Sequence, residues 1–246
     1  MMNLSYDCLD SDEESDSSDI HLHVDDDPCC SLLSFPKLQI RSDVSRARWR
    51  SDLCIAELVD RKGKIWVSTG IVRSGKIFCF LEEIVYLVEI GALILLDEND
   101  SEILLDDLYG KFEEKSNGCN WENFMSYKHL KSLGYIVGRH NVPWTFKCNE
   151  EGIDLALDQT TKSVDNLHLD NLIPSFNVYQ PNSKFKKSSP GDPDFMLFVI
   201  RGRPLCNSQI KAISRNCGSV PLKLCHVDHG RVSFFSTEKV DLPILP

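Results

Sequence analysis

The chain has 246 residues, of which 42% are hydrophobic, and this is enough for one large domain or two small ones with buried cores. No apolar run approaches the roughly 18 residues that a membrane-spanning helix needs, so we expect no membrane partner. The ten cysteines include no Cys-X-X-Cys pair, so the sequence predicts neither a zinc site nor a disulfide framework, and we expect no cofactor.

The formal net charge of −10 comes from one end of the chain. Residues 1–27 hold ten acidic residues and no lysine or arginine, and the remaining 27 acidic residues balance the 27 basic ones. We therefore expect residues 1–27 to form a disordered acidic tail. Its serines are candidate sites for an acid-directed kinase, with a plain solubilising tail as the alternative. The formally neutral remainder can bind nucleic acid only through local basic patches.

Residues 28–147 are predicted to form the first domain, which opens with a basic run. Arg41, Arg46, Arg48 and Arg50 surround Trp49 in this run. Arginine beside tryptophan can grip phosphates and stack on bases. The same pattern is also typical of a solvated face with one anchoring aromatic side chain, and the sequence leaves both interpretations open.

Hydrophobic periodicity and glycine stops predict the elements that follow in this domain. Glu82 and Glu83 suit the first turn of a helix that Gly91 ends, and Asn99 with Glu102 resembles a capping box. The expected elements are strands at 65–68 and 76–80 around a turn region at 70–75, a helix at 81–90, a buried strand at 92–96, a helix with leucines at 104, 105 and 108, and a helix at 121–133. One core is expected to hold residues 40–147.

A basic helix, a glycine and a short strand end this domain. The helix ends at Leu133, and Gly134 supplies the left-handed conformation that often follows a last helical turn. An apolar strand at 135–137 then leads to Arg139 and His140. This order predicts a winged-helix-like unit, with the helix–strand corner of an ordinary α/β core as the alternative.

Residues 148–170 lose periodicity and are predicted to be a linker to a second, small domain at 171–246. Its expected elements are a strand at 175–180, a polar loop at 181–193, a strand at 194–200, a short helix capped by Asn207, and a hairpin of strands at 222–227 and 232–235. The apolar end at 242–246 is expected to dock on its own core or on a partner. The predicted fold class is therefore α+β, or mixed α/β.

Several stretches resemble a known family. Residues 80–93 (FLEEIVYLVEIGAL) and 127–140 (YKHLKSLGYIVGRH) resemble the N-terminal domain of the larger structural subunit of the eukaryotic tRNA-splicing endonuclease. Residues 176–182 (FNVYQPN), 185–187 (FKK) and 190–195 (PGDPDF) are similar to the C-terminal domain of that subunit. The resemblance covers about residues 40–147 and 171–246, and it implies an endonuclease-like α/β fold for the second domain.

The resemblance implies a heterotetramer of two catalytic and two structural subunits that removes introns from precursor tRNA. Its catalytic subunits use a tyrosine as base, a histidine as acid and a lysine to stabilise the charged transition state, without metal. In this chain Tyr179 stands at the tyrosine position and Asp194 at the histidine position. The lysine position falls near Pro221 or Leu222, one or two residues from Lys223. Since an ionised aspartate cannot donate the proton, the resemblance implies a non-catalytic subunit that pairs with a catalytic one.

Local charge alone selects the candidate RNA contacts, whereas the subunit pairing that the resemblance implies selects the candidate interface residues. The candidate RNA contacts are Lys128, Lys131, Arg139 and His140, followed by Lys184, Lys186 and Lys187. The candidate interface residues are Val232, Phe234, Phe235, Leu242, Ile244 and Leu245. The alternatives are solvated lysines beside an interface, a catalytic subunit with a degenerate motif, and a winged-helix-like nucleic-acid-binding adaptor. The resemblance favours the nucleus, with the cytoplasm as the alternative.

Overall fold

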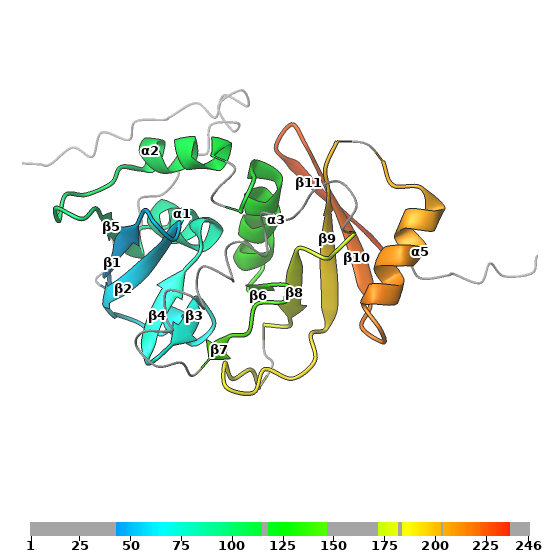
Figure 1. Ribbon diagram of the computed structural model, residues 1–246, viewed down its shortest axis with the longest axis horizontal. Coiled ribbons are helices and arrows are strands. Elements are labelled where there is room, and N and C mark those ends of the chain that lie inside the picture. The colour runs from blue at the N-terminus through cyan, green and yellow to red at the C-terminus, as the bar shows by residue number, and fades with distance from the viewer. Residues whose placement is uncertain (1–42, 115–117, 147–171, 182–183, 203, 237–246) are drawn as a thin grey trace, which may run out of the picture. The chain divides into compact units, whose positions relative to one another are not determined.

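The computed structural model describes residues 43–114, 118–146, 172–181, 184–202 and 204–236 (Figure 1). The predicted acidic tail, linker and apolar end lie outside these residues. Within them, two β-sheets and four α-helices confirm the mixed α/β class. The helix α2 spans Leu105–Gly110 and is followed by a 3₁₀ turn, η3, at Lys111–Glu113.

The first sheet has the strand order β5-β1-β2-β4-β3-β7. Its strands are β1 (Ser45–Arg50), β2 (Ile55–Asp60), β3 (Ile71–Arg73), β4 (Lys76–Cys79), β5 (Leu93–Leu96) and β7 (Thr145–Phe146). Helix α1 (Leu81–Glu89) follows β4 directly and buries Ile84, Val85 and Leu87 in the core of this sheet. Gly91 has a positive φ of 66°, so the predicted helix and its glycine stop are confirmed.

Two local predictions in the first half of the chain are wrong. The expected strand at 65–68 is a 3₁₀ turn, η2, at Ile65–Val67, because Trp66 is buried and donates its indole N–H to Ser45 Oγ at 2.9 Å. The expected Asn99 cap does not form. Instead, Asp97 Oδ1 accepts the backbone N–H groups of Asn99 and Ser101, both at 2.8 Å, and closes a turn before α2.

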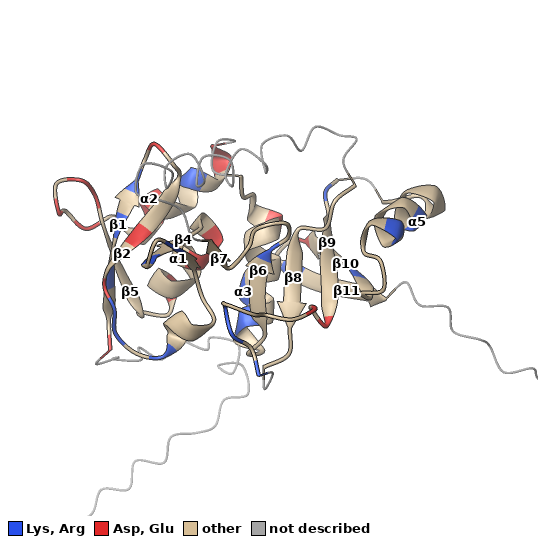
Figure 2. Ribbon diagram, turned by 60° about the horizontal axis from the view of Figure 1, so that its bottom comes forward, with Lys and Arg blue, Asp and Glu red and all other residues tan. Residues whose placement is uncertain are grey.

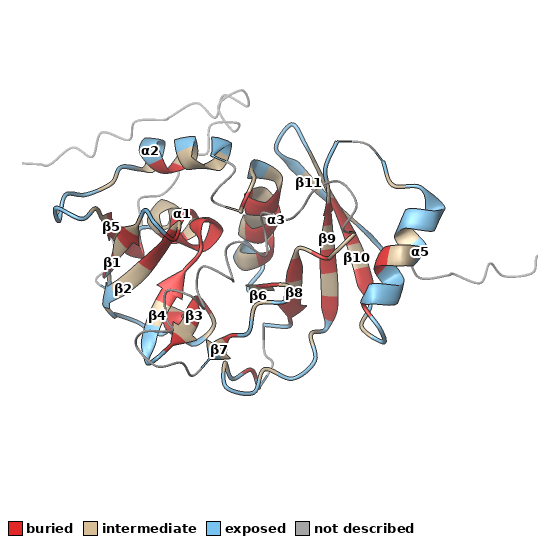
Figure 3. Ribbon diagram, in the orientation of Figure 1, coloured by how far each residue is buried: buried red, intermediate tan, exposed pale blue. Residues whose placement is uncertain are grey.

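The second sheet has the strand order β11-β10-β9-β8-β6. Its strands are β6 (Ile136–Arg139), β8 (Phe176–Tyr179), β9 (Phe195–Ile200), β10 (Leu222–Asp228) and β11 (Arg231–Ser236). Helix α3 (Trp121–Ser132) packs on one face through Tyr127 and Leu130. The short helix α5 (Asn207–Asn216) packs on other residues of β9 and β10 through Ile213. The buried positions of both helices lie on the sides that face the sheet (Figure 3).

The expectation of a single core over residues 40–147 is wrong, because β6 belongs to the second sheet. It pairs antiparallel with β8, with Val137 opposite Val178, and its side chains share a core with Phe176. The chain turns at Asn141 (φ 60°), and β7 then pairs with β3 of the first sheet. A strand needs a partner for its backbone N–H and C=O groups. The partner of β6 lies beyond residues 147–171, so local sequence patterns do not reveal it.

Candidate nucleic-acid interface

Two of the candidate lysines converge on Thr69, a buried residue between η2 and β3. Lys187 Nζ, from the loop between β8 and β9, donates to the Thr69 carbonyl oxygen at 2.5 Å. Lys131 Nζ, near the end of α3, donates to Thr69 Oγ1 at 3.4 Å. Figure 2 shows a cationic part of α3 beside a cationic loop that runs towards β9. The fold therefore joins three segments that lie far apart in the sequence into one site.

The backbone at Gly70, next to Thr69, leaves no room for a larger residue. Gly70 has a positive φ of 76°, and a Cβ there would lie 2.8 Å from Ile77 Cγ2 and 2.9 Å from the Phe78 carbonyl oxygen. Its N–H donates to Glu83 Oε1 at 2.8 Å, and the Phe80 N–H donates to Glu83 Oε2 at 3.0 Å. Glu83 thus fixes the position of the Thr69–Gly70 backbone against the start of α1.

The lysines at Thr69 have perturbed acid–base properties. Burial lowers the pKa of Lys187 from 10.5 to about 8, an effect that Glu83 opposes and that Arg61 and Lys131 reinforce. Burial also lowers the pKa of Lys131, again opposed by Glu83. The pKa of the Glu83 carboxyl is raised, first by burial and then by the neighbouring Glu82. Burial thus disfavours the charged form of both ammonium groups, and an anion bound beside them would stabilise that form.

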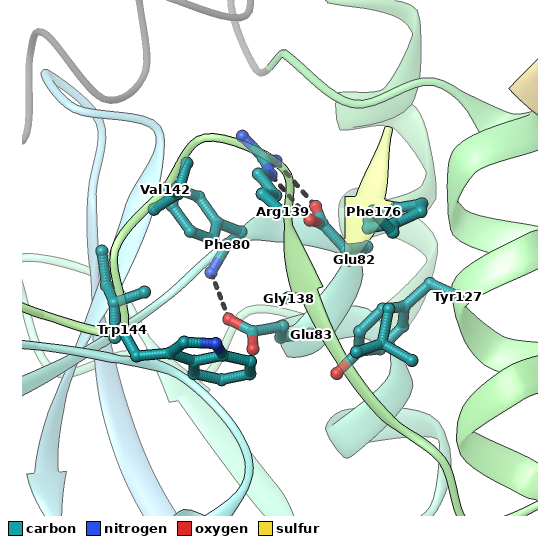
Figure 4. A pocket seen from close by; sticks show the side chains of 11 residues that line it. Phe80, Glu82, Glu83, Tyr127, Gly138, Arg139, Val142, Trp144 and Phe176 are labelled. Carbon is teal, nitrogen blue, oxygen red and sulfur yellow. Dashed lines mark hydrogen bonds and ion pairs between the residues drawn. The ribbon is translucent and has the colours of Figure 1, made fainter. Parts of the chain in front are cut away.

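Arg139 is placed differently from the other candidate RNA contacts. Its guanidinium donates two hydrogen bonds to the Glu82 carboxylate, both at 2.7 Å, and lies 3.9 Å from the centre of the Phe80 ring (Figure 4). The side chains of Arg139 and Glu82 are only 6% and 2% exposed. The phosphate contact expected of Arg139 is therefore contradicted by its burial, and this residue is an internal cation that joins β6 to α1.

The remaining candidate RNA contacts fall into two groups. Lys128 Nζ forms an ion pair with Glu89 at 2.7 Å, and His140 Nδ1 lies 2.8 Å from Asn177 Oδ1, so both have protein partners. Lys184 and Lys186 are exposed on the same loop as Lys187. This loop and the end of α3 are consequently the cationic surface on which the remaining candidate RNA contacts gather.

The basic run around Trp49 does not form a base-stacking surface. Trp49 is 4% exposed within the first core, and Lys111 Nζ lies 5.0 Å from the centre of its ring. Arg48 forms an ion pair with Asp100, and Arg50 with Asp52 at 3.3 Å. The interpretation of Trp49 as a base-stacking residue is therefore wrong, because its ring is used for packing.

Tyr179, at the expected position of a catalytic tyrosine, is buried in an aromatic cluster. It is 4% exposed, and its ring centre lies 5.1 Å from that of Phe185 and 6.4 Å from that of Trp144. Burial raises the pKa of Tyr179, which makes the phenol a poorer source of the phenolate. A base must reach the proton that it abstracts, and a phenol enclosed in this way does not reach one.

The two other positions of the expected catalytic set also have structural contacts. Asp194 Oδ2 accepts the backbone N–H of Gln180 at 2.8 Å, next to the end of β8. Lys223 Nζ lies 4.3 Å from the centre of the Phe195 ring. Each of the three side chains therefore contributes to packing or to hydrogen bonds of the second sheet.

The candidate interface strand β11 is an edge strand of the sheet within the described residues. Val232 and Phe234 are half-buried against the core beneath α3, and the Phe234 ring lies 5.5 Å from the ring of His129. Phe235 is 52% exposed. Leu242, Ile244 and Leu245 lie outside the described residues. Of the described candidates, Phe235 is thus the large apolar side chain that is available to a partner.

Among the described residues, no three His, Cys, Asp or Glu side chains lie together as a potential metal-binding group. In the same part of the chain, no helix has both the length and the apolar character needed to cross a membrane.

Comparison with known proteins agrees with the tRNA-splicing endonuclease resemblance. Residues 30–97 match a family model described as the N-terminal part of tRNA-splicing endonuclease subunit Sen54. This range includes Thr69, Glu82 and Glu83. The similarity is therefore to subunits of the tRNA-splicing endonuclease, the family that the sequence stretches resemble.

Two curated relatives narrow the resemblance to the Sen54 type. The chain is 24% identical over 132 residues to tRNA-splicing endonuclease subunit Sen54 of Mus musculus, with 52% of this chain and 25% of the relative covered. It is 24% identical over 229 residues to tRNA-splicing endonuclease subunit SEN54 of Eremothecium gossypii, with 63% and 50% covered. The chain thus spans half or less of the length of these relatives.

Proposed function

We propose that the chain is a non-catalytic structural subunit of a tRNA-splicing endonuclease, where it pairs with a catalytic subunit and helps to position precursor tRNA. The observation that carries the proposal is the match of residues 30–97 to the Sen54 N-terminal family, together with the two Sen54 relatives. The heterotetramer, the tRNA substrate and a nuclear location are parts of the proposal.

The environment of Tyr179 supports the absence of catalysis. The chemistry expected of a catalytic subunit requires an accessible base and a proton donor. Here the phenol is enclosed by Trp144 and Phe185, and Asp194 stands where the donor would be. The packing of these residues favours a structural sheet over an active site.

The domain assignments are also part of the proposal. We assign residues 28–147 to an N-terminal subunit domain whose α3–β6 end is winged-helix-like, and residues 171–246 to an endonuclease-like domain. The helix–strand order of α3 and β6 supports the first assignment, and the β8-to-β11 order supports the second. The pairing of β6 with β8 means that the two domains share the second sheet.

Co-expression with the catalytic and structural partners tests the proposed assembly. We expect the full-length chain to co-purify with them and the complex to cut an intron-containing precursor tRNA. Phe235→Glu places a charge on the exposed face of β11 and is expected to reduce co-purification strongly, because the interface must then bury an unpaired carboxylate.

Val59→Glu is the matched control, because Val59 is 58% exposed on β2 of the other sheet. We expect it to leave co-purification unchanged. A chain that purifies alone, monodisperse and without affinity for the endonuclease subunits would contradict the proposed function. Equal losses in the two variants would contradict the β11 interface.

A further inference from the structure

We propose that Lys131 and Lys187, both anchored on the buried Thr69, form a single phosphate-binding site that holds one backbone phosphate of the RNA. This inference rests on the proposed function, since it takes RNA as the ligand, and it assigns a defined contact within the cationic surface. It also distinguishes these two lysines from Lys184 and Lys186, which are exposed on the same loop.

The geometry supports one shared phosphate. Both ammonium groups bind the same residue, one at the Thr69 carbonyl oxygen and the other at Oγ1. An ammonium group has three N–H donors, so each lysine keeps donors beyond its bond to Thr69. Both side chains are half-buried, which leaves part of each in contact with solvent. Two cations that share one anchoring residue are placed to share one anion.

The site is also organised before a ligand binds. Thr69 is fully buried, and Glu83 fixes the next backbone N–H group at 2.8 Å. The Lys187 ammonium is held by a 2.5 Å hydrogen bond. Little side-chain entropy is therefore lost when a phosphate binds, in contrast to the exposed lysines of the loop.

The charged groups around Lys187 make RNA binding at this site depend on pH. The charged or titratable groups that act on Lys187 are Glu83 on α1, Cys79 on β4, Arg61 after β2 and Lys131 on α3. With a pKa of about 8, Lys187 loses its proton as the pH rises from 7 to 9 in the free protein. A bound phosphate favours the ammonium form, so above pH 8 the RNA must bind together with a proton and its affinity falls.

A double-mutant cycle on the full-length chain tests the shared phosphate, with a precursor tRNA transcript as the probe. Lys131→Met and Lys187→Met each remove one charge and keep most of the aliphatic chain. We expect each variant to lower the affinity for the transcript by about fivefold. Each should also reduce, by about 1, the slope of the logarithm of this affinity against the logarithm of the salt concentration. The double variant should lose hardly more slope than either single variant, because the same phosphate is lost.

Lys211→Met, on the exposed face of α5, is the matched control for net charge and should change affinity by less than about twofold. Additive losses, with a slope change of about 2 in the double variant, would overturn the shared site. An effect of Lys211→Met equal to that of the two site variants would also overturn it, because a general charge effect would then explain the binding.

The pH dependence provides a second test that does not require the loss of Lys187. Lys187→Arg retains a donor for Thr69 and stays charged at pH 9. Between pH 7 and pH 9 we expect the affinity of the unaltered chain to fall about fivefold and that of Lys187→Arg to stay nearly constant. Equal pH profiles would overturn the proposal. Its failure is distinct from that of the proposed function, which is measured as assembly and cleavage.

Discussion

The ion pair between Glu82 and Arg139 joins the first turn of α1 to the end of β6. Both side chains are almost fully buried, and the guanidinium also stacks on Phe80. Removing one member of such a pair leaves an unpaired buried charge, which typically costs about 3–5 kcal/mol. Replacing both members by apolar residues often costs little, because no charge is left unpaired.

Arg139→Met is therefore expected to lower the free energy of unfolding by about 3 kcal/mol, as measured by urea denaturation. The double variant Glu82→Leu with Arg139→Met should recover most of this loss. Arg139→Met should change RNA affinity no more than its loss of stability explains, since the guanidinium faces Glu82. A loss below about 1 kcal/mol in the single variant would contradict the role of the ion pair.

Residue patterns predicted the candidate lysines but did not separate their roles. The sequence places Lys131 and Arg139 in one basic stretch, and both were expected to contact phosphate. The structure leaves Lys131 half-buried beside Thr69 and buries Arg139 against Glu82. The distinction depends on a carboxylate 57 residues away in the chain, which no local pattern reveals. Thr69 itself carries no sequence signal, because its importance arises from the two lysines that converge on it.

Strand β6 belongs to the second sheet and leads directly into a strand of the first. It pairs with β8 of the second sheet, and the chain that follows it enters the first sheet as β7. At Gly138, a Cβ atom would lie 2.5 Å from Trp144 Cζ2 and 2.9 Å from Cε2. Trp144 in turn packs against Tyr179 and Phe185. The missing side chain at Gly138 thus makes room for the aromatic cluster.

Gly138→Ala is expected to lower the free energy of unfolding by about 1–3 kcal/mol, because the indole must move within a packed core. Gly110→Ala is the matched control, since nothing lies within 4 Å of the added methyl group at the end of α2. We expect the control to be neutral or slightly stabilising. Equal unfolding midpoints for the two variants would show that the space beside Trp144 is not limiting.

Elements were predicted well where local signals are sufficient. Helix α1 follows from its acidic first turn and Gly91, and the end of α3 follows from Gly134; both glycines have positive φ. The strands β4, β5 and β9 follow from short apolar runs. The errors at 65–68 and at Asn99 arise from tertiary contacts, namely the Trp66–Ser45 hydrogen bond and the Asp97 turn. The partner of β6 could not be predicted for the same reason.

At the scale of the whole molecule, the cationic surface and the edge strand β11 belong to different parts of the fold. The surface combines the segment around Thr69, the end of α3 and the loop before β9, whereas β11 closes the far edge of the second sheet from β6. A subunit organised in this way can hold RNA with one part and a catalytic partner with another. The proposed function requires this division, because it assigns the chemistry to other subunits.

The most direct test of this account is cleavage of an intron-containing precursor tRNA by the reconstituted assembly with Tyr179→Phe in this chain. The substitution removes the hydroxyl and keeps the ring that packs between Trp144 and Phe185. We predict unchanged cleavage rates at both splice sites, because the proposed function places the catalytic groups in partner subunits. Loss of one cut, in an assembly that still forms and binds RNA, would show that this chain performs chemistry and would contradict the proposal.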